Sequence, residues 1–234
     1  MRSAERGRGK DMSKESGLIY VPILHTRRET AGIARSLGDS ANTSSTATQA
    51  PDDDDRSTGD DRSIQEMWDG IAAKLNDAHL PYERVRIFQE AMPVCGMEKE
   101  IAESLAAQGS RNHQLVLDLV GRGARLEGTE NPDLLMQEHE YLTALIAAGA
   151  VPTLREVGTE RSAFEGYQAK SKALMEKRDT FIAARIRSTI REGELPLVFM
   201  GVRHQLDKQL DGDFMITYLI YRLPFRKIGD IYIV

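Results

Sequence analysis

A short apolar run that ends in a histidine occurs twice in this chain, and this feature most constrains its fold. Residues 18–24, Leu-Ile-Tyr-Val-Pro-Ile-Leu, precede His25, and residues 198–203, Val-Phe-Met-Gly-Val-Arg, precede His204. β-Branched and aromatic residues in such short runs are typical of buried strands. In an open α/β sheet the ligand crevice lies at the carboxyl ends of the strands. The two histidines can therefore share one crevice, although each could instead be a polar strand end satisfied by backbone groups.

The length and the charge narrow the class of protein. A chain of 234 residues can form one substantial domain with a hydrophobic core. The formal net charge of −5 argues against nucleic acid as the main partner, because phosphate contacts require a basic surface. The single cysteine, Cys95, cannot form an internal disulfide, and no apolar run approaches the roughly 20 residues that cross a bilayer. We therefore expect a cytoplasmic protein that binds neither nucleic acid nor a membrane.

Two segments are too polar to contribute to a core. Residues 1–16 are basic and polar, and we predict that they form a disordered tail. Residues 39–62 combine Ser, Thr, Ala and Asn with the acidic run Pro51-Asp-Asp-Asp-Asp55, which predicts a flexible insert. The predicted organisation is a single α/β domain over residues 17–234 that contains this acidic insert.

Strand patterns alternate with helical patterns along the rest of the chain. This alternation predicts an α/β fold with an open, mixed or mostly parallel sheet flanked by helices. The predicted strands are residues 18–24, 84–89, 124–128, 196–200 and 214–220. The predicted helices are residues 27–37, 63–77, 97–108, 111–121, 132–148, 160–192 and 204–210.

Two glutamates occupy the same kind of position as the two histidines. Glu90 directly follows the predicted strand 84–89, and Glu130 follows the predicted strand 124–128 just before an Asn-Pro pair. Either glutamate alone could be a helix cap or a solvated side chain. Because the carboxyl ends of parallel strands meet at one edge of a sheet, we expect these glutamates and the two histidines to line one crevice.

Two imidazoles and two carboxylates suit two kinds of hydrolytic chemistry. His25, Glu90 and His204 could hold a divalent metal such as Mn²⁺, Co²⁺ or Zn²⁺ with an open position for water. Alternatively, a histidine or glutamate with a pKa near neutrality could activate water without a metal. Arg178, in the predicted helix 160–192, could hold a carboxylate or stabilise an oxyanion through its planar fork, or could be a surface ion-pair residue.

The C-terminal half of the chain resembles a known superfamily. The resemblance is carried by the run Lys177-Arg-Asp-Thr-Phe-Ile-Ala-Ala-Arg-Ile-Arg-Ser-Thr-Ile190, followed by Leu197-Val-Phe-Met-Gly-Val-Arg-His204. It is similar to the pattern of TraB/PrgY, TIKI, GumN, ChaN-like and erythromycin-esterase-like proteins, in which Arg-Asn or Arg-Asp starts a helix and an apolar strand with Gly-x-x-His follows. The family's acidic position corresponds to Glu90, with Glu130 as a second candidate. Its N-terminal Gly-x-x-His corresponds to Pro22-Ile-Leu-His25, where proline replaces glycine.

The resemblance implies an α/β fold with a site lined by histidine and glutamate. Members of the superfamily include metal-dependent proteases and antibiotic-inactivating esterases. We therefore predict a hydrolase of ester or peptide bonds that acts on a small-molecule or peptide substrate. In this prediction His25, Glu90 and His204 activate water, and Arg178 stabilises negative charge. The alternative is a non-catalytic module that binds a ligand or peptide in the same crevice, and the proline of the N-terminal motif favours it.

Overall fold

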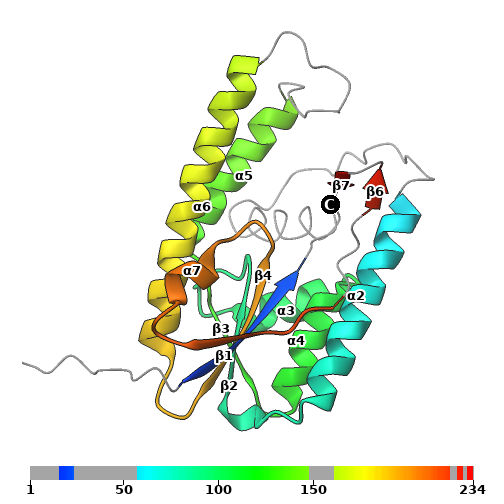
Figure 1. Ribbon diagram of the computed structural model, residues 1–234, viewed down its shortest axis with the longest axis vertical. Helices are drawn as coiled ribbons and strands as arrows, with labels where there is room; N and C mark the ends of the chain where they lie inside the picture. Colours follow the sequence, from blue (N-terminus) through cyan, green and yellow to red (C-terminus); the bar gives the residue numbers. More distant parts are fainter. Residues whose placement is uncertain (1–15, 24–56, 148–160, 222–225, 229–230, 234) are drawn as a thin grey trace, which may run out of the picture.

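A five-stranded parallel sheet forms the centre of the molecule (Figure 1). The computed structural model describes residues 16–23, 57–147, 161–221, 226–228 and 231–233. The strands lie in the order β3-β2-β4-β1-β5, and every pairing within this sheet is parallel. Their bounds are Gly17–Ile23 for β1, Val85–Gln89 for β2, Arg125–Glu127 for β3, Leu195–Gly201 for β4 and Met215–Tyr218 for β5. The predicted α/β class is confirmed.

Helices connect the strands and cover both faces of the sheet. Their bounds are Ser57–Asp77 for α2, Glu98–Ala107 for α3, Arg111–Gly121 for α4, Pro132–Ala147 for α5, Arg161–Thr189 for α6 and Leu206–Leu210 for α7, with a short 3₁₀ helix at Tyr82–Arg84. A separate antiparallel pair, β6 (Arg226–Ile228) and β7 (Ile231–Ile233), follows the sheet. Among the helices described, none contains a stretch long and apolar enough to span a bilayer.

The sheet separates two hydrophobic layers. On one face, side chains of α2 and α4 pack against Val21, Ile87 and Phe199, and the Phe199 ring lies 6.1 Å from that of Trp68. On the other face, side chains of α6 and α7 pack against Phe88 and Val198. Because both faces are buried, β4 is apolar at successive positions and does not alternate with polar residues, as is typical of parallel sheets.

Pairing between β2 and β4 sets the geometry of the sheet edge. Ile87 pairs with Leu197 and Gln89 with Phe199, so the two strands end nearly level. The backbone N–H of Glu90 continues this ladder by donating to Phe199 O at 3.0 Å. Residues that follow β2 and β4 are therefore held side by side at the carboxyl edge.

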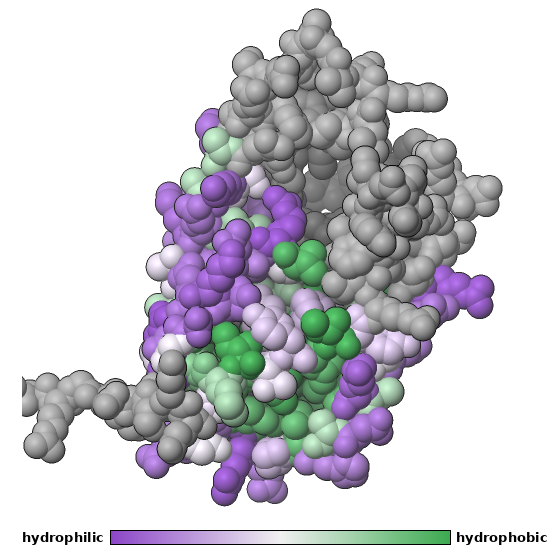
Figure 2. All heavy atoms as spheres, viewed as in Figure 1, coloured by the Kyte–Doolittle hydropathy of each residue, from purple (hydrophilic) through white to green (hydrophobic). Residues whose placement is uncertain are grey.

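Polar and apolar side chains are segregated on the face drawn in Figure 2. Polar side chains gather along the flank formed by α6, whereas apolar side chains gather near the sheet edge at β5. The exposed apolar residues of that region include Met215 and Ile220. The sheet edge therefore carries apolar surface, and the flank formed by α6 is polar.

The predicted helices and strands agree with the described ones to within three residues except at three places, one of which is the unpredicted 3₁₀ helix at Tyr82–Arg84. Helix α2 begins at Ser57 rather than at residue 63, so it includes the last six residues of the predicted insert. The antiparallel β6–β7 pair was not predicted.

Several predicted segments lie outside the described residues. They are residues 1–15 of the predicted tail, the predicted helix 27–37 and residues 39–56 of the predicted insert.

Candidate active site

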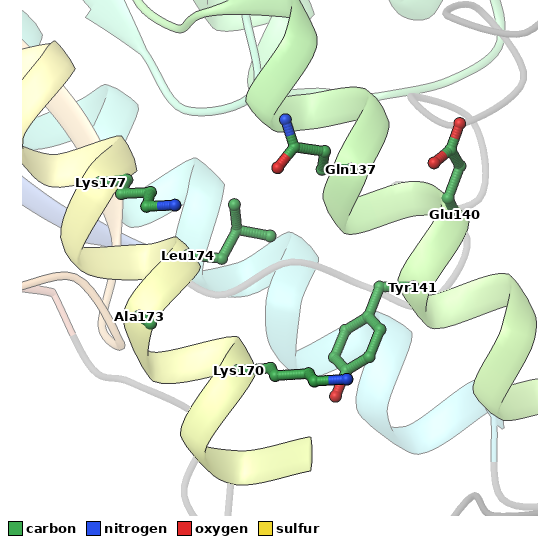
Figure 3. A pocket seen from close by; sticks show the side chains of 7 residues that line it. All are labelled: Gln137, Glu140, Tyr141, Lys170, Ala173, Leu174 and Lys177. Carbon is green, nitrogen blue, oxygen red and sulfur yellow. The ribbon is translucent and has the colours of Figure 1, made fainter. Parts of the chain in front are cut away.

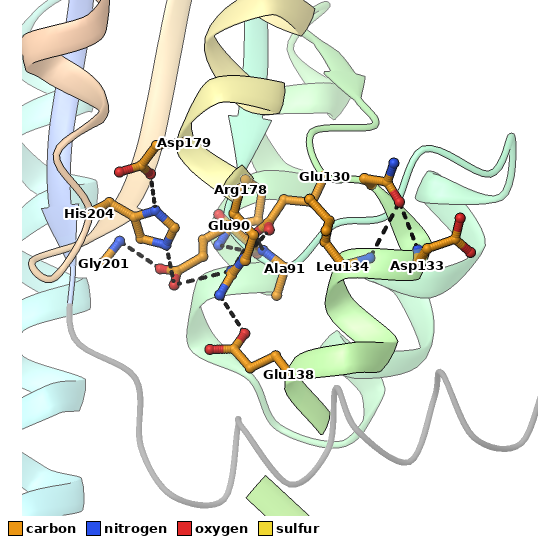
Figure 4. A network of polar contacts seen from close by, with 12 residues as sticks. Glu90, Ala91, Glu130, Asp133, Leu134, Glu138, Arg178, Asp179, Gly201 and His204 are labelled. Atoms are coloured by element: carbon orange, nitrogen blue, oxygen red, sulfur yellow. Dashed lines mark hydrogen bonds and ion pairs between the residues drawn. The ribbon is translucent and has the colours of Figure 1, made fainter. Parts of the chain in front are cut away.

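Four of the five residues predicted from the sequence meet at the carboxyl edge of the sheet (Figure 4). Glu90 follows β2, Glu130 follows β3 and His204 follows β4, as the strand pattern predicted. Arg178 reaches the same place from α6 and contacts both glutamates. The fifth predicted residue, His25, lies outside the described residues.

His204 forms a hydrogen bond through each of its ring nitrogens. Nδ1 lies 2.5 Å from Asp179 Oδ1, and Nε2 lies 3.0 Å from Glu90 Oε1. Ionised carboxylates only accept hydrogen bonds, so a proton on each nitrogen satisfies both contacts. The imidazole side chain has no exposed surface, whereas 12% of the Glu90 side chain is exposed. The geometry therefore favours an imidazolium that lies behind a partly accessible carboxylate.

The surroundings of His204 favour its charged form. Burial by itself lowers the pKa of His204 from its ordinary value of 6.5, but hydrogen bonds to Asp179 and Glu90 outweigh burial. The resulting pKa is about 9. His204 is therefore protonated at neutral pH, in contrast to the neutral imidazole that a metal ligand or a general base requires.

Glu90 is held in place by the backbone as well as by His204. Its Oε2 accepts a hydrogen bond of 2.6 Å from the Gly201 N–H, at the last residue of β4. A Cβ at position 201 would lie 2.5 Å from Glu90 Oε2, so any larger residue there would displace the carboxylate from this position. In the Gly-x-x-His pattern the glycine therefore binds one oxygen of Glu90 through its N–H, and the histidine three residues later binds the other oxygen.

Arg178 holds the carboxylates on the other side of the site. Its Nε and Nη2 donate to the two oxygens of Glu130 at 2.5 and 2.6 Å, and its Nη1 donates to Glu138 on α5. Nη2 also lies 3.8 Å from Glu90 Oε1. Burial alone would lower the pKa of Arg178, but the facing glutamates, Glu130 above all, raise it. Only 3% of Arg178 is exposed, so it is not the surface ion-pair residue of the alternative interpretation.

The planar fork predicted for Arg178 therefore binds a carboxylate of this chain. The sequence predicted a substrate carboxylate or an oxyanion as the partner of this fork. In the structure all three guanidinium nitrogens contact Glu130 or Glu138, so none is free to bind a substrate group. Arg178 instead positions the glutamates, and its charge remains close to Glu90.

Local backbone structure fixes Glu130 precisely enough for this contact. Asn131 caps α5, because its Oδ1 accepts hydrogen bonds from the N–H groups of Asp133 and Leu134. Pro132 occupies the first helical position, where no N–H donor is lost. Glu130 Oε1 also accepts a hydrogen bond of 2.7 Å from the N–H of Ala91. The φ of Ala91 is 61°, which is unusual for a residue other than glycine. The loop after β2 is thus bound to the loop after β3.

Two residues of the network were not predicted from the sequence. Asp179 is part of the Arg-Asp pair in the resemblance, and it lies four residues before the buried Ala183 on α6. Glu138 lies three residues after the buried Leu135 on α5. Helical spacing from these buried positions places both carboxylates on or beside the inner face of their helices. This spacing is the signal that could have identified them.

The arrangement of donors does not fit the predicted metal site. Both nitrogens of His204 contact carboxylates, so neither offers a lone pair to a metal. Within the described ranges, which exclude His25, no group of three or more His, Cys, Asp and Glu side chains could hold a metal ion. We therefore derive no chemical step from Mn²⁺, Co²⁺ or Zn²⁺.

Comparisons with known proteins identify no relative of this chain. No family model, curated protein or solved structure matches it.

We expect Arg178→Lys to destabilise the fold by about 3 kcal/mol, because a single ammonium cannot replace contacts to both Glu130 and Glu138 and leaves buried charge uncompensated. Urea unfolding measures this change. The matched control is Arg187→Lys on the same helix, where the ion pair with Asp213 is about 40% exposed and the expected loss is below about 0.5 kcal/mol. Equal losses in the two variants would contradict the role assigned to Arg178.

We also expect the free energy of unfolding to decrease as the pH rises from 6.5 towards 9. In this window the folded state keeps a proton on His204 that the unfolded state has lost, so the stabilisation is complete below 6.5 and disappears through about 9. Melting temperatures across this range test the sign. His204→Gln should flatten the decrease, whereas His79→Asn, at an exposed histidine, should retain it. An unchanged pH dependence in His204→Gln would contradict the raised pKa.

Proposed function

We propose that the protein is a hydrolase of carboxylic ester or peptide bonds in which Glu90 activates the attacking water. The observation that carries the proposal is the hydrogen-bonded pair of Glu90 and His204 at the carboxyl edge of a parallel sheet. Glu90 is partly exposed and both of its oxygens are positioned, by His204 and by the Gly201 N–H, so it can accept a proton from a bound water. The resemblance to TraB/PrgY, TIKI and erythromycin-esterase-like proteins supports the same reaction class.

The proposed reaction needs one carboxylate and one water molecule. Glu90 accepts a proton as the water O–H bond breaks and the water oxygen forms a bond to the substrate carbonyl carbon. The carbonyl oxygen then carries the negative charge of the tetrahedral intermediate. When the intermediate collapses, the bond to the leaving group breaks and Glu90 returns its proton to the leaving oxygen or nitrogen. Atoms and charge balance without a redox partner.

The other residues position Glu90 and adjust its electrostatic surroundings. His204 donates to Glu90 through Nε2, and Asp179 maintains the charge of His204 through Nδ1. Arg178 positions Glu130 and Glu138 and keeps a positive charge 3.8 Å from Glu90. No step uses a metal, so a chelator should leave turnover unchanged. The predicted role of His25 in water activation is not tested, because His25 lies outside the described residues.

Hydrolysis of para-nitrophenyl esters tests the proposal. We expect Glu90→Gln to lower kcat by about 100-fold or more, the usual contribution of a general base. Glu100→Gln, at an exposed carboxylate of α3, is the matched control and should retain activity. Hydrolysis that is equal in wild type and Glu90→Gln would contradict the proposal.

The pH profile distinguishes a positioning role for Asp179 from a purely structural one. Loss of the His204 proton should reduce the rate as the pH rises through about 9. Asp179→Asn replaces the charged acceptor of one of these hydrogen bonds with a neutral amide, which favours the imidazolium less, so this alkaline limb should move to lower pH. A folded variant with a lower rate but an unmoved limb would assign Asp179 a structural role only.

The second candidate is the non-catalytic ligand- or peptide-binding module. One observation favours it: the two cations of the network are already occupied, since Arg178 is bound by glutamates and the His204 side chain is fully buried. Absence of Glu90-dependent turnover across esters and peptides, together with a ligand that raises the melting temperature, would select this candidate.

A further inference from the structure

A cleft between α5 and α6 begins beside the candidate active site (Figure 3). Its volume is about 500 Å³, which is within the range of small-molecule sites. Tyr141 from α5 and Lys170, Leu174 and Lys177 from α6 are among the residues that line it. The cleft therefore combines apolar and positively charged groups.

The cleft and the polar network of the active site lie between the same two helices. Gln137 and Lys177 line the cleft, and the next residue on each helix, Glu138 and Arg178, belongs to the network. The ion pair between Glu138 and Arg178 joins α5 to α6 at this point. The Glu138 side chain is 27% exposed, so solvent reaches the network at this residue, next along α5 to Gln137 of the cleft.

The cleft carries two further cations, whereas the cations of the active site are already paired with carboxylates. At neutral pH the network contains the carboxylates of Glu90, Glu130, Glu138 and Asp179 but only two cations, Arg178 and His204. A negatively charged substrate group is therefore repelled there. In the cleft, neither Lys170 nor Lys177 forms an ion pair within the described part of the chain.

Apolar contacts lie between these two cations. Lys170 Nζ is 6.0 Å from the centre of the Tyr141 ring, and Leu174 lies one helical turn from both Lys170 and Lys177. Seven residues of helix separate the two lysines by about 10 Å. Glu140, the carboxylate among the lining residues, points away from α6 in Figure 3.

We propose that this cleft binds the part of the substrate that carries a negative charge and an apolar group. Lys170 or Lys177 binds the anion, and Leu174 and Tyr141 contact the apolar part. The inference rests on the proposed hydrolase function, because it places the scissile bond at Glu90 and the anionic group along the cleft. The substrate class is thus an ester or amide with a carboxylate on an apolar acyl or leaving group.

Binding of a charged and a neutral probe tests the cleft without turnover. Hydrocinnamate has an apolar ring and a carboxylate, and hydrocinnamamide is its neutral counterpart. Ligand-observed NMR should detect tighter binding of hydrocinnamate by the wild-type protein. The double variant Lys170→Glu, Lys177→Glu should weaken it by about tenfold or more, whereas Lys172→Glu, off the lining face of α6, should leave it unchanged. Equal binding of the two probes, binding unchanged in the double variant, or binding of neither probe would overturn the proposal.

Paired esters separate failure of this inference from failure of the proposed function. The wild-type protein should hydrolyse para-nitrophenyl hemiglutarate with a higher kcat/KM than the neutral para-nitrophenyl pentanoate, and the double lysine variant should remove this preference. Glu90-dependent hydrolysis without a preference for charge would overturn the cleft assignment and retain the hydrolase. Lysine-dependent binding of hydrocinnamate without hydrolysis of either ester would overturn the hydrolase and support an anion-binding site.

Discussion

The contact of the Arg178 guanidinium with Glu130 and Glu138 is the interaction on which the rest of the site depends. Glu130 has no exposed side-chain surface, and an unpaired buried carboxylate would cost several kcal/mol. The same guanidinium joins α6 to the loop after β3 and to α5. It therefore determines the relation of these helices to the sheet edge, and with it the position of the cleft between them.

His204 extends this network across the sheet. It lies after β4 and contacts Asp179 on α6 and Glu90 after β2, so one protonated ring joins three elements. Gly201 permits the close approach that brings Glu90 against the end of β4. The buried cations hold the site together, and Glu90 and Glu138 are the more exposed of the carboxylates that they contact.

The sequence was sufficient to predict the five strands of the main sheet and the convergence of Glu90, Glu130 and His204 at its carboxyl edge, because each follows a clear apolar run. It was not sufficient to predict the partners of these residues. The sequence indicated that the Arg178 guanidinium binds a carboxylate, but not which one. The choice between Glu130 and a substrate depends on how α6 packs. The sequence could not indicate the protonation state of His204 either, because this state depends on contact with Asp179 and Glu90. The short β6–β7 pair was not predicted either.

The most direct test of the account is the protonation state of His204, measured by ¹⁵N NMR of the imidazole ring between pH 5 and pH 10, with His204→Gln used to assign the signal. The account predicts that both ring nitrogens are protonated at neutral pH and that the titration midpoint lies near 9. A midpoint at or below the ordinary value of 6.5 would show a neutral imidazole at Glu90 and would contradict the proposed arrangement.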